Sequence, residues 1–230
     1  MGNLSHLDEL EAEAIYIIRE VAAECENPVM LYSIGKDSSV MLHLAMKAFY
    51  PEKPPFPFLH IDTTWKFKEM ISVPWPYRKK MGIEMLVYTN EEGVKAGINP
   101  FDHGSAYTDI MKTQALKQAL NKYQLRQHLA ADVVMKKSPV QRNVSSHSEM
   151  QHRHGTRKTS ALKCGSFITQ RFTRVKVSVF FPISNWTEKD IWQYIKRENI
   201  EIVPLYFAKE RPVIYRDGNI IMVDDDRLKL

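Results

Sequence analysis

A short polar segment near the N-terminus has the residue types of a phosphate-binding loop, and it consists of Ser33, Ile34, Gly35, Lys36, Asp37 and Ser38. An apolar run precedes it and an amphipathic run follows it, which predicts a strand, a loop and a helix. Backbone N–H groups at a helix N-terminus lack intrahelical acceptors and lie at the positive end of the helix dipole, so they attract anions. Lys36 adds a full charge, and the hydroxyls of Ser33 and Ser38 add donors. We therefore expect these residues to bind phosphate, with Lys36 and Asp37 as candidate catalytic residues.

The loop does not fit the Walker A pattern. Met30 stands where the first glycine of that pattern is required, and Asp37 stands where Ser or Thr should follow the lysine. An ordinary turn between a strand and a helix is the alternative interpretation. Asp37 also has two interpretations, because its carboxylate can complement the helix dipole or can hold Mg²⁺ beside a phosphate.

Asp62 stands at the end of a second apolar run. An aspartate in that place can cap a helix that begins near residue 65. In a parallel sheet, however, ligands bind at the carboxyl ends of the strands. We therefore expect Asp62 to contribute to a nucleotide site together with the loop.

Several segments resemble, in order, those of one enzyme family. The loop is similar to the Ser-Gly-Gly-Lys-Asp-Ser loop of the ATP pyrophosphatase (PP-loop) superfamily, with Ile34 in place of one glycine. Together with later segments, it resembles the small, ATP-binding subunit of bacterial sulfate adenylyltransferase, including its nodulation paralogue. The resemblance covers about residues 5–123 and 180–228. It rests on residues 33–38, 60–67, 97–101, 108–113, 184–188, 190–195 and 202–207.

The resemblance implies transfer of the AMP moiety of ATP to sulfate, which gives adenosine 5′-phosphosulfate and pyrophosphate. It implies that the pyrophosphate is held by Ser33, Gly35, Lys36 and Ser38 with the help of Mg²⁺. It also implies a larger GTPase subunit as partner, and a role either in sulfate assimilation or in sulfation of a nodulation signal.

Two other classes of function stay open. A phosphosulfate reductase has the same fold but needs a catalytic cysteine near its C-terminus, and Cys25 and Cys164 are poorly placed for that role. An inactive PP-loop remnant would keep the nucleotide fold without its substrate loop. Formation of product from labelled sulfate distinguishes the first class from these two.

The order of the elements predicts the fold class. Apolar spacing predicts parallel β-α units in a doubly wound, mostly parallel α/β sheet, the Rossmann-like fold of adenine-nucleotide PP-loop proteins. The residues 1–123 and 177–230 form this domain in our interpretation. We expect helices at 6–25, 38–49, 66–80, 109–123 and 187–197, strands at 29–33, 57–61, 84–88 and 177–181, and a loop region at 89–108.

Residues 124–176 form an irregular basic segment, with no sustained period of 2 or 3.6. At this place the related family has a Gly-Gly-Ala-Arg-Arg-Asp-Glu-Glu loop. A coding sequence for that loop, read one base late, yields residues 130–141, and a second family segment read with the same offset yields residues 156–165. We therefore hypothesise a frameshifted reading. We also expect the C-terminal tail of the family to be absent, because the chain ends at Leu230, where the family continues.

Composition limits the partners. The chain of 230 residues has a net charge of +5. Residues 124–178 contain eleven Lys and Arg against two acidic residues, a net of +9 that leaves −4 for the remainder. This basic stretch lacks the interleaved aromatic residues that stack on bases, so we expect no nucleic-acid partner. No apolar run is long enough to cross a bilayer and no signal peptide is recognisable, which predicts a cytoplasmic protein without membrane contact.

Overall fold

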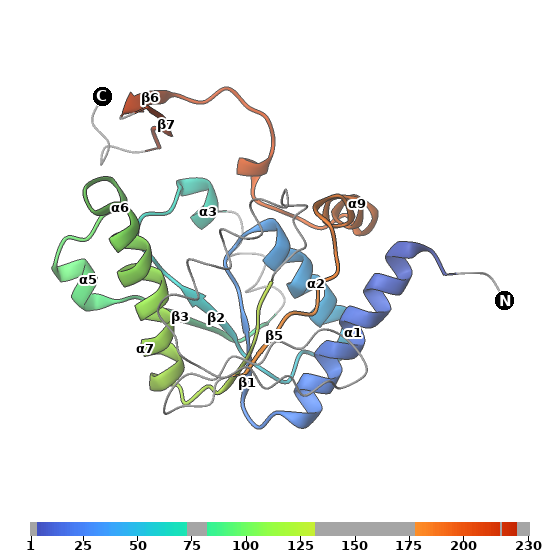
Figure 1. Cartoon of the computed structure of the whole chain (residues 1–230). Helices are drawn as coiled ribbons and strands as arrows, with labels where there is room; N and C mark the ends of the chain where they lie inside the picture. The colour runs from blue at the N-terminus through green and yellow to red at the C-terminus, as the bar shows by residue number, and fades with distance from the viewer. Residues whose placement is uncertain (1–3, 73–81, 132–177, 217, 225–230) are drawn as a thin grey trace, which may run out of the picture.

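The computed structural model describes residues 4–72, 82–131, 178–216 and 218–224. Within these residues, five strands form one sheet in the order β3-β2-β1-β4-β5 (Figure 1). All neighbouring strands are parallel, so their carboxyl ends lie at one edge of the sheet. The strands are β1 (Pro28–Leu31), β2 (Phe58–Ile61), β3 (Met85–Tyr88), β4 (Gln127–Leu129) and β5 (Ser178–Phe180).

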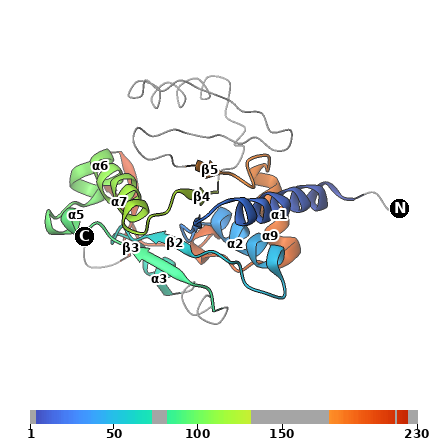
Figure 2. The ribbon, with the colours of Figure 1, turned by 90° about the horizontal axis from the view of Figure 1, so that it is seen from below.

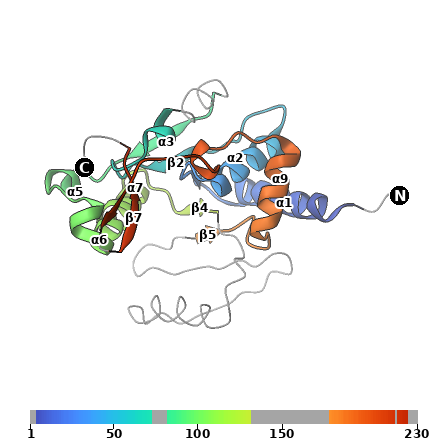
Figure 3. The same cartoon turned by 90° about the horizontal axis from the view of Figure 1, so that it is seen from above.

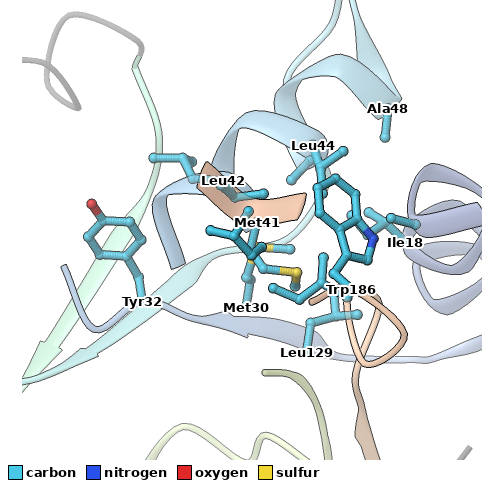
Figure 4. Packing of buried hydrophobic residues seen from close by; sticks show 14 of the residues in the cluster. Ile18, Met30, Tyr32, Met41, Leu42, Leu44, Ala48, Leu129 and Trp186 are labelled. Atoms are coloured by element: carbon cyan, nitrogen blue, oxygen red, sulfur yellow. The ribbon is translucent and has the colours of Figure 1, made fainter. Parts of the chain in front are cut away.

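Helices cover both faces of the sheet. Successive residues of a strand point to opposite faces, and here the residues on both faces are apolar and pack against helices. Met30 packs with α1 (His6–Glu24), α2 (Lys36–Phe49) and α9 (Glu188–Glu198), and the indole of Trp186 is fully buried in this core (Figure 4). Val29 faces the other way, toward α7 (Ala115–Lys122). Figures 2 and 3 show the two helical layers on either side of the sheet. The doubly wound α/β architecture is as predicted.

The helix that begins after Thr187 is confirmed together with its capping box. The Thr187 hydroxyl accepts the backbone N–H of Asp190, and the Asp190 carboxylate accepts the backbone N–H of Thr187. Two donors at the helix start are thereby satisfied by side chains. The capping box fixes the first turn of α9, in which Glu188 stands.

The region 89–108 is not the predicted loop. It contains α5 (Glu91–Lys95) and α6 (Pro100–Thr108), which continues through a π-helical stretch (Asp109–Gln114) into α7. Asn90 and Asn99 are the N-caps: their side chains accept backbone N–H groups of the following turns, and Pro100 occupies the first turn of α6. Gly97, with φ 67°, follows α5, and Gly104, with φ 49°, interrupts α6.

The first residues of the predicted irregular segment include a strand. Residues 127–129, inside the predicted segment, form β4, which pairs with β1 on one side and with β5 on the other. Three residues are too few to show a period of 2, which is why the sequence pattern missed them. The rest of the suspected frameshifted stretch lies outside the described residues from position 132 onward. Of the predicted helix 66–80, the structure describes α3 (Lys68–Ser72) and no residues from 73 to 80.

After α9 the chain forms a short 3-10 turn, η2 (Pro204–Tyr206), and then passes over the carboxyl edge of the sheet (Figures 1 and 3). It ends in a hairpin of β6 (Val213–Arg216) and β7 (Asn219–Met222). Arg211 anchors this passage through an ion pair of 2.8 Å with Glu69 of α3. Every helix in the described ranges is too short or too polar to cross a membrane.

Candidate functional site

The predicted phosphate loop lies between β1 and α2, at the carboxyl edge of the sheet. Gly35 is the N-cap of α2, so the helix begins at Lys36, two residues earlier than predicted. Lys36, Asp37 and Ser38 are therefore first-turn residues, whose backbone N–H groups have no acceptor within the helix. The structure thus brings the predicted loop residues together at a helix N-terminus, which is the arrangement that attracts an anion.

Ile34 keeps the backbone shape of the glycine that it replaces. Its φ is 70°, in the left-handed region that L-residues and especially β-branched residues avoid. That conformation costs about 1–2 kcal/mol. The side chain is 1% exposed within the main core cluster, and burial of an isoleucine stabilises by about 1.5–3 kcal/mol. Core packing therefore holds the loop in a conformation that Ile34 alone would avoid.

Hydrogen bonds between the serines close the loop. The Ser33 hydroxyl donates to the Ser38 Oγ at 3.2 Å, and the Ser38 hydroxyl donates to the Gly35 carbonyl at 2.8 Å. A side chain at Gly35 would place its Cβ 3.3 Å from Ser33 Oγ and 3.1 Å from Tyr206 Oη. Both contacts would be tight, so a Cβ at this position would require Ser33 or Tyr206 to shift by a few tenths of an ångström.

The Lys36 ammonium group is held between two carboxylates. Its Nζ lies 2.7 Å from Asp37 Oδ1 and 3.1 Å from Glu188 Oε2, and its side chain is 11% exposed. Burial lowers the pKa of Lys36, but the hydrogen bonds to Asp37 and Glu188 outweigh it, so that the pKa is raised above its ordinary value. The loop therefore contains a fixed positive charge at neutral pH.

Tyr206 of η2 reaches the same helix end. The backbone N–H of Lys36 donates to Tyr206 Oη at 3.1 Å, across 170 residues of chain. The ring of Tyr206 contacts the indole of Trp192 edge-on, with 6.1 Å between centroids. Trp192 in turn donates its Nε1–H to Glu188 Oε1 at 3.0 Å. Glu188, Trp192 and Tyr206 thus form one connected cluster against Lys36, and we call these three residues the acceptor cluster.

Asp62 lies at the end of β2, the strand next to β1. Its Oδ1 accepts the backbone N–H of Thr64 at 3.0 Å and lies 3.0 Å from Lys66 Nζ. The following helix begins at Lys68, so Asp62 is not its N-cap. Burial raises the pKa of Asp62, but the Thr64 N–H and the Lys66 ammonium group outweigh it and lower the pKa below its usual range.

His60 links this strand end to the loop. It is 2% exposed, and its Nδ1 lies 2.6 Å from the Tyr32 carbonyl oxygen in the residue before the loop. Because a carbonyl only accepts, Nδ1 bears the proton and Nε2 is left to accept from the Lys66 ammonium group, which contacts it. Lys66 is therefore a second positive charge at the carboxyl edge, beside the loop.

Comparison with known proteins gives the family. The model of the phosphoadenosine phosphosulfate reductase domain matches residues 27–216. Sulfate adenylyltransferase subunit 2 of Marinobacter nauticus is 57% identical over 230 residues, which are 99% of this chain and 75% of the relative. The corresponding subunit of Shewanella sp. strain ANA-3 is 58% identical over 99% of this chain and 76% of the relative. The chain belongs to the sulfate adenylyltransferase subunit 2 family. The resemblance noted in the sequence is confirmed.

Solved structures agree with the fold of this family member. A phosphoadenylyl-sulfate reductase from Candida auris has a TM-score of 0.61 at 14% identity, over 89% of this chain and 93% of that chain. An NH3-dependent NAD synthetase from Campylobacter jejuni has a TM-score of 0.52 at 13% identity, over 86% and 75%. These likenesses confirm the predicted adenine-nucleotide PP-loop fold.

The structure therefore places the family's loop as predicted, but it also adds residues to the site that sequence reasoning gave no role. Glu188, Trp192 and Tyr206 lie within the segments that support the resemblance, yet nothing in their local pattern indicates contact with a loop more than 150 residues earlier. Lys66 was given no role either, although it forms an ion pair with the predicted site residue Asp62.

Proposed function

We propose that this chain is the nucleotidyltransferase that moves the AMP moiety of ATP to sulfate, forming adenosine 5′-phosphosulfate and pyrophosphate. The observation that supports it best is the loop of residues 33–38, which combines a helix N-terminus with a protonated lysine. The transferase name of relatives more than 50% identical selects this reaction among the chemistries that the fold performs.

Charge stabilisation on the leaving group is the main task of the loop. As the bond between the α- and β-phosphates breaks, negative charge develops on the departing pyrophosphate. Lys36 and the first-turn N–H groups are fixed in place before the reaction, so they stabilise that charge without reorganisation. Ser33 and Ser38 add hydroxyl donors. Sulfate is a weak nucleophile, so the remaining contribution is to hold both substrates in line.

Mg²⁺ enters our proposal together with ATP. We assign Asp37 as its protein ligand, because its carboxylate stands in the first turn of α2 with its side chain 34% exposed. Among the described residues, no group of three or more potential metal-ligating side chains occurs. One carboxylate fits an ion that keeps several waters and binds mainly to substrate phosphates. Such an ion would neutralise phosphate charge during transfer.

A partner subunit is implied by the subunit name of the relatives. We propose that this partner is a larger GTPase subunit, whose hydrolysis of GTP drives the unfavourable synthesis of the phosphosulfate anhydride. We expect the complex in the cytoplasm, where ATP and GTP are both available. Robust net synthesis by this chain alone, without GTP, would contradict the coupling.

The cysteines give little support to the alternative of a phosphosulfate reductase. Cys25 follows α1 and precedes β1, so it lies at the amino edge of the sheet, opposite the loop. Burial, with a smaller contribution from Glu24, raises the pKa of its thiol, which disfavours the reactive thiolate. Cys164 lies outside the described residues.

The test separates binding from turnover. Titration calorimetry should detect binding of Mg–ATP to the chain, since the described loop is sufficient for it. Conversion of labelled sulfate, with the partner subunit and GTP present, should require the family loop that our frameshift hypothesis restores in residues 130–176. If the restored chain binds ATP but forms no phosphosulfate with its partner, the proposed reaction is wrong.

A further inference from the structure

Two oxygen atoms of the acceptor cluster occupy positions that suit phosphate oxygens. Tyr206 Oη accepts the backbone N–H of Lys36 at 3.1 Å. Glu188 Oε2 accepts from Lys36 Nζ at 3.1 Å. An amide N–H at a helix N-terminus and a lysine ammonium group are the two kinds of donor that a phosphate loop offers to its ligand. In this structure both donors of Lys36 are already engaged by oxygen atoms of the protein.

The two sides of these contacts differ in exposure. The Lys36 side chain is 11% exposed and fixed in the first turn of α2. The Glu188 side chain is 51% exposed, and Tyr206 is 41% exposed. The donors are therefore the buried side of each contact, and the acceptors are the exposed side, whose polar atoms would regain hydrogen bonds with water at small cost when displaced. Arrival of an anion would thus displace the acceptors and leave the donors in place.

The acceptor cluster should respond as one unit. Trp192 donates to Glu188 and lies against the ring of Tyr206, so movement of either residue changes its surroundings. Tyr206 Oη also lies over Gly35, 3.1 Å from the position that a Cβ on that residue would take. A pyrophosphate group cannot reach the Lys36 N–H while Tyr206 Oη accepts from it.

We propose that Tyr206 Oη and Glu188 Oε2 hold, in the nucleotide-free chain, the places of two oxygens of the pyrophosphate moiety of ATP, and that ATP displaces both. The inference rests on the proposed function, because it assigns the pyrophosphate moiety to this loop. Tyr206 and Glu188 then compete with the ligand for the donors of Lys36, and this competition lowers the affinity of the loop for the ligand. A ligand without a pyrophosphate group gains nothing by displacing them.

The test uses two substitutions that each remove one competing oxygen contact. Tyr206→Phe removes the hydroxyl and keeps the ring against Trp192. Glu188→Gln removes the charge and keeps an oxygen for the Trp192 N–H. Each variant should bind Mg–ATP and inorganic pyrophosphate about 2- to 10-fold more tightly in titration calorimetry, which is the range of one net hydrogen bond. Affinity for AMP should stay unchanged.

Matched controls come from exposed residues of the same types. Tyr215→Phe removes a hydroxyl from a tyrosine that is 78% exposed in β6, and Glu201→Gln removes a charge from the exposed turn after α9. Both should bind Mg–ATP as the unmodified chain does. Mg–ATP should also change the tryptophan fluorescence of the unmodified chain, because displacement of Glu188 and Tyr206 alters the surroundings of Trp192. Trp192→Phe should remove the contribution of Trp192 to this change.

The outcomes separate the two proposals. If the unmodified chain binds neither Mg–ATP nor pyrophosphate, the proposed function is wrong. If it binds them, but Tyr206→Phe and Glu188→Gln bind no more tightly, the displacement inference alone is wrong. Weaker binding by either variant would also overturn it, because the residue would then contribute to holding the nucleotide.

Discussion

The carboxyl edge of the sheet and its interior treat basic side chains differently. At the edge, Lys36 and Lys66 each lie against a carboxylate, and the side chains of both lysines are 11% exposed. In the interior, His128 of β4 is 6% exposed, and its Nδ1 has no hydrogen-bond partner in the part of the chain that the structure describes. Burial lowers the pKa of His128 to about 4. The two lysines at the edge therefore have charged partners, whereas burial without such a partner favours the neutral form of His128.

The largest effect that we expect is on turnover. Under the frameshift hypothesis, restoring the family reading of residues 130–176 adds an arginine-containing loop that meets the phosphates and sulfate. Loss of a group that stabilises transition-state charge commonly costs about 100-fold or more in rate. Phosphosulfate formation with the partner subunit should therefore rise at least about 100-fold over the present chain. Resequencing of the gene is the first measurement, and a normal rate from the chain as written would contradict the hypothesis.

The effect of burying His128 can be tested through the pH dependence of the free energy of unfolding. His128 has a pKa of about 4 in the folded chain and about 6.5 when unfolded, so the unfolded state takes up the proton first. The free energy of unfolding should fall as the pH drops from about 6.5 to about 4, by about 3 kcal/mol in all from this group. Urea titrations at several pH values measure the slope. His128→Gln should flatten it, and an unchanged slope would show that His128 is not the cause.

Binding of Mg–ATP at the carboxyl edge can be tested by substituting Lys36. Lys36→Ala removes a charge-assisted contact of about 1.5–3 kcal/mol, so affinity for Mg–ATP should fall about 10- to 100-fold in titration calorimetry. Lys95→Ala is the matched control, because Lys95 is exposed in α5 away from the loop. Equal affinity of Lys36→Ala and the unmodified chain would remove the loop from the site.

The second lysine should matter more for the fold than for the ligand. Lys66→Ala takes a hydrogen-bond donor from buried His60 and a cation from Asp62. We expect a loss of about 1 kcal/mol in the free energy of unfolding, measured in urea. Affinity for Mg–ATP should fall less than it does for Lys36→Ala. A larger fall would mean that Lys66 contacts the phosphates directly, and the contrast between the two lysines would need revision.

The sequence predicted the contiguous loop at residues 33–38 but missed the long-range contacts of Lys36 and two short helices. The loop was recognisable because strand, turn and helix are contiguous, so the positions of Ser33 to Ser38 follow from short-range geometry. Asp62 followed from the rule that parallel strands end at one edge. Glu188 and Tyr206 reach Lys36 only after α9 has packed on α2, which no local pattern encodes. The short helices α5 and α6 were missed because their capping asparagines, with Pro and Gly, also suit loops.

The left-handed conformation of Ile34 reverses the usual order of stability between alanine and glycine substitutions. Alanine is usually better tolerated than glycine, since glycine loses more chain entropy on folding, by roughly 0.5–1 kcal/mol. At position 34 glycine empties the space of one carbon atom more than alanine does, but only glycine relieves the backbone at φ 70°, which costs an L-residue about 1–2 kcal/mol. Ile34→Gly should therefore be the more stable of the two. Packing of the Ile34 side chain in the core thus stabilises the backbone conformation of the loop, so looser packing around Ile34 should change that conformation.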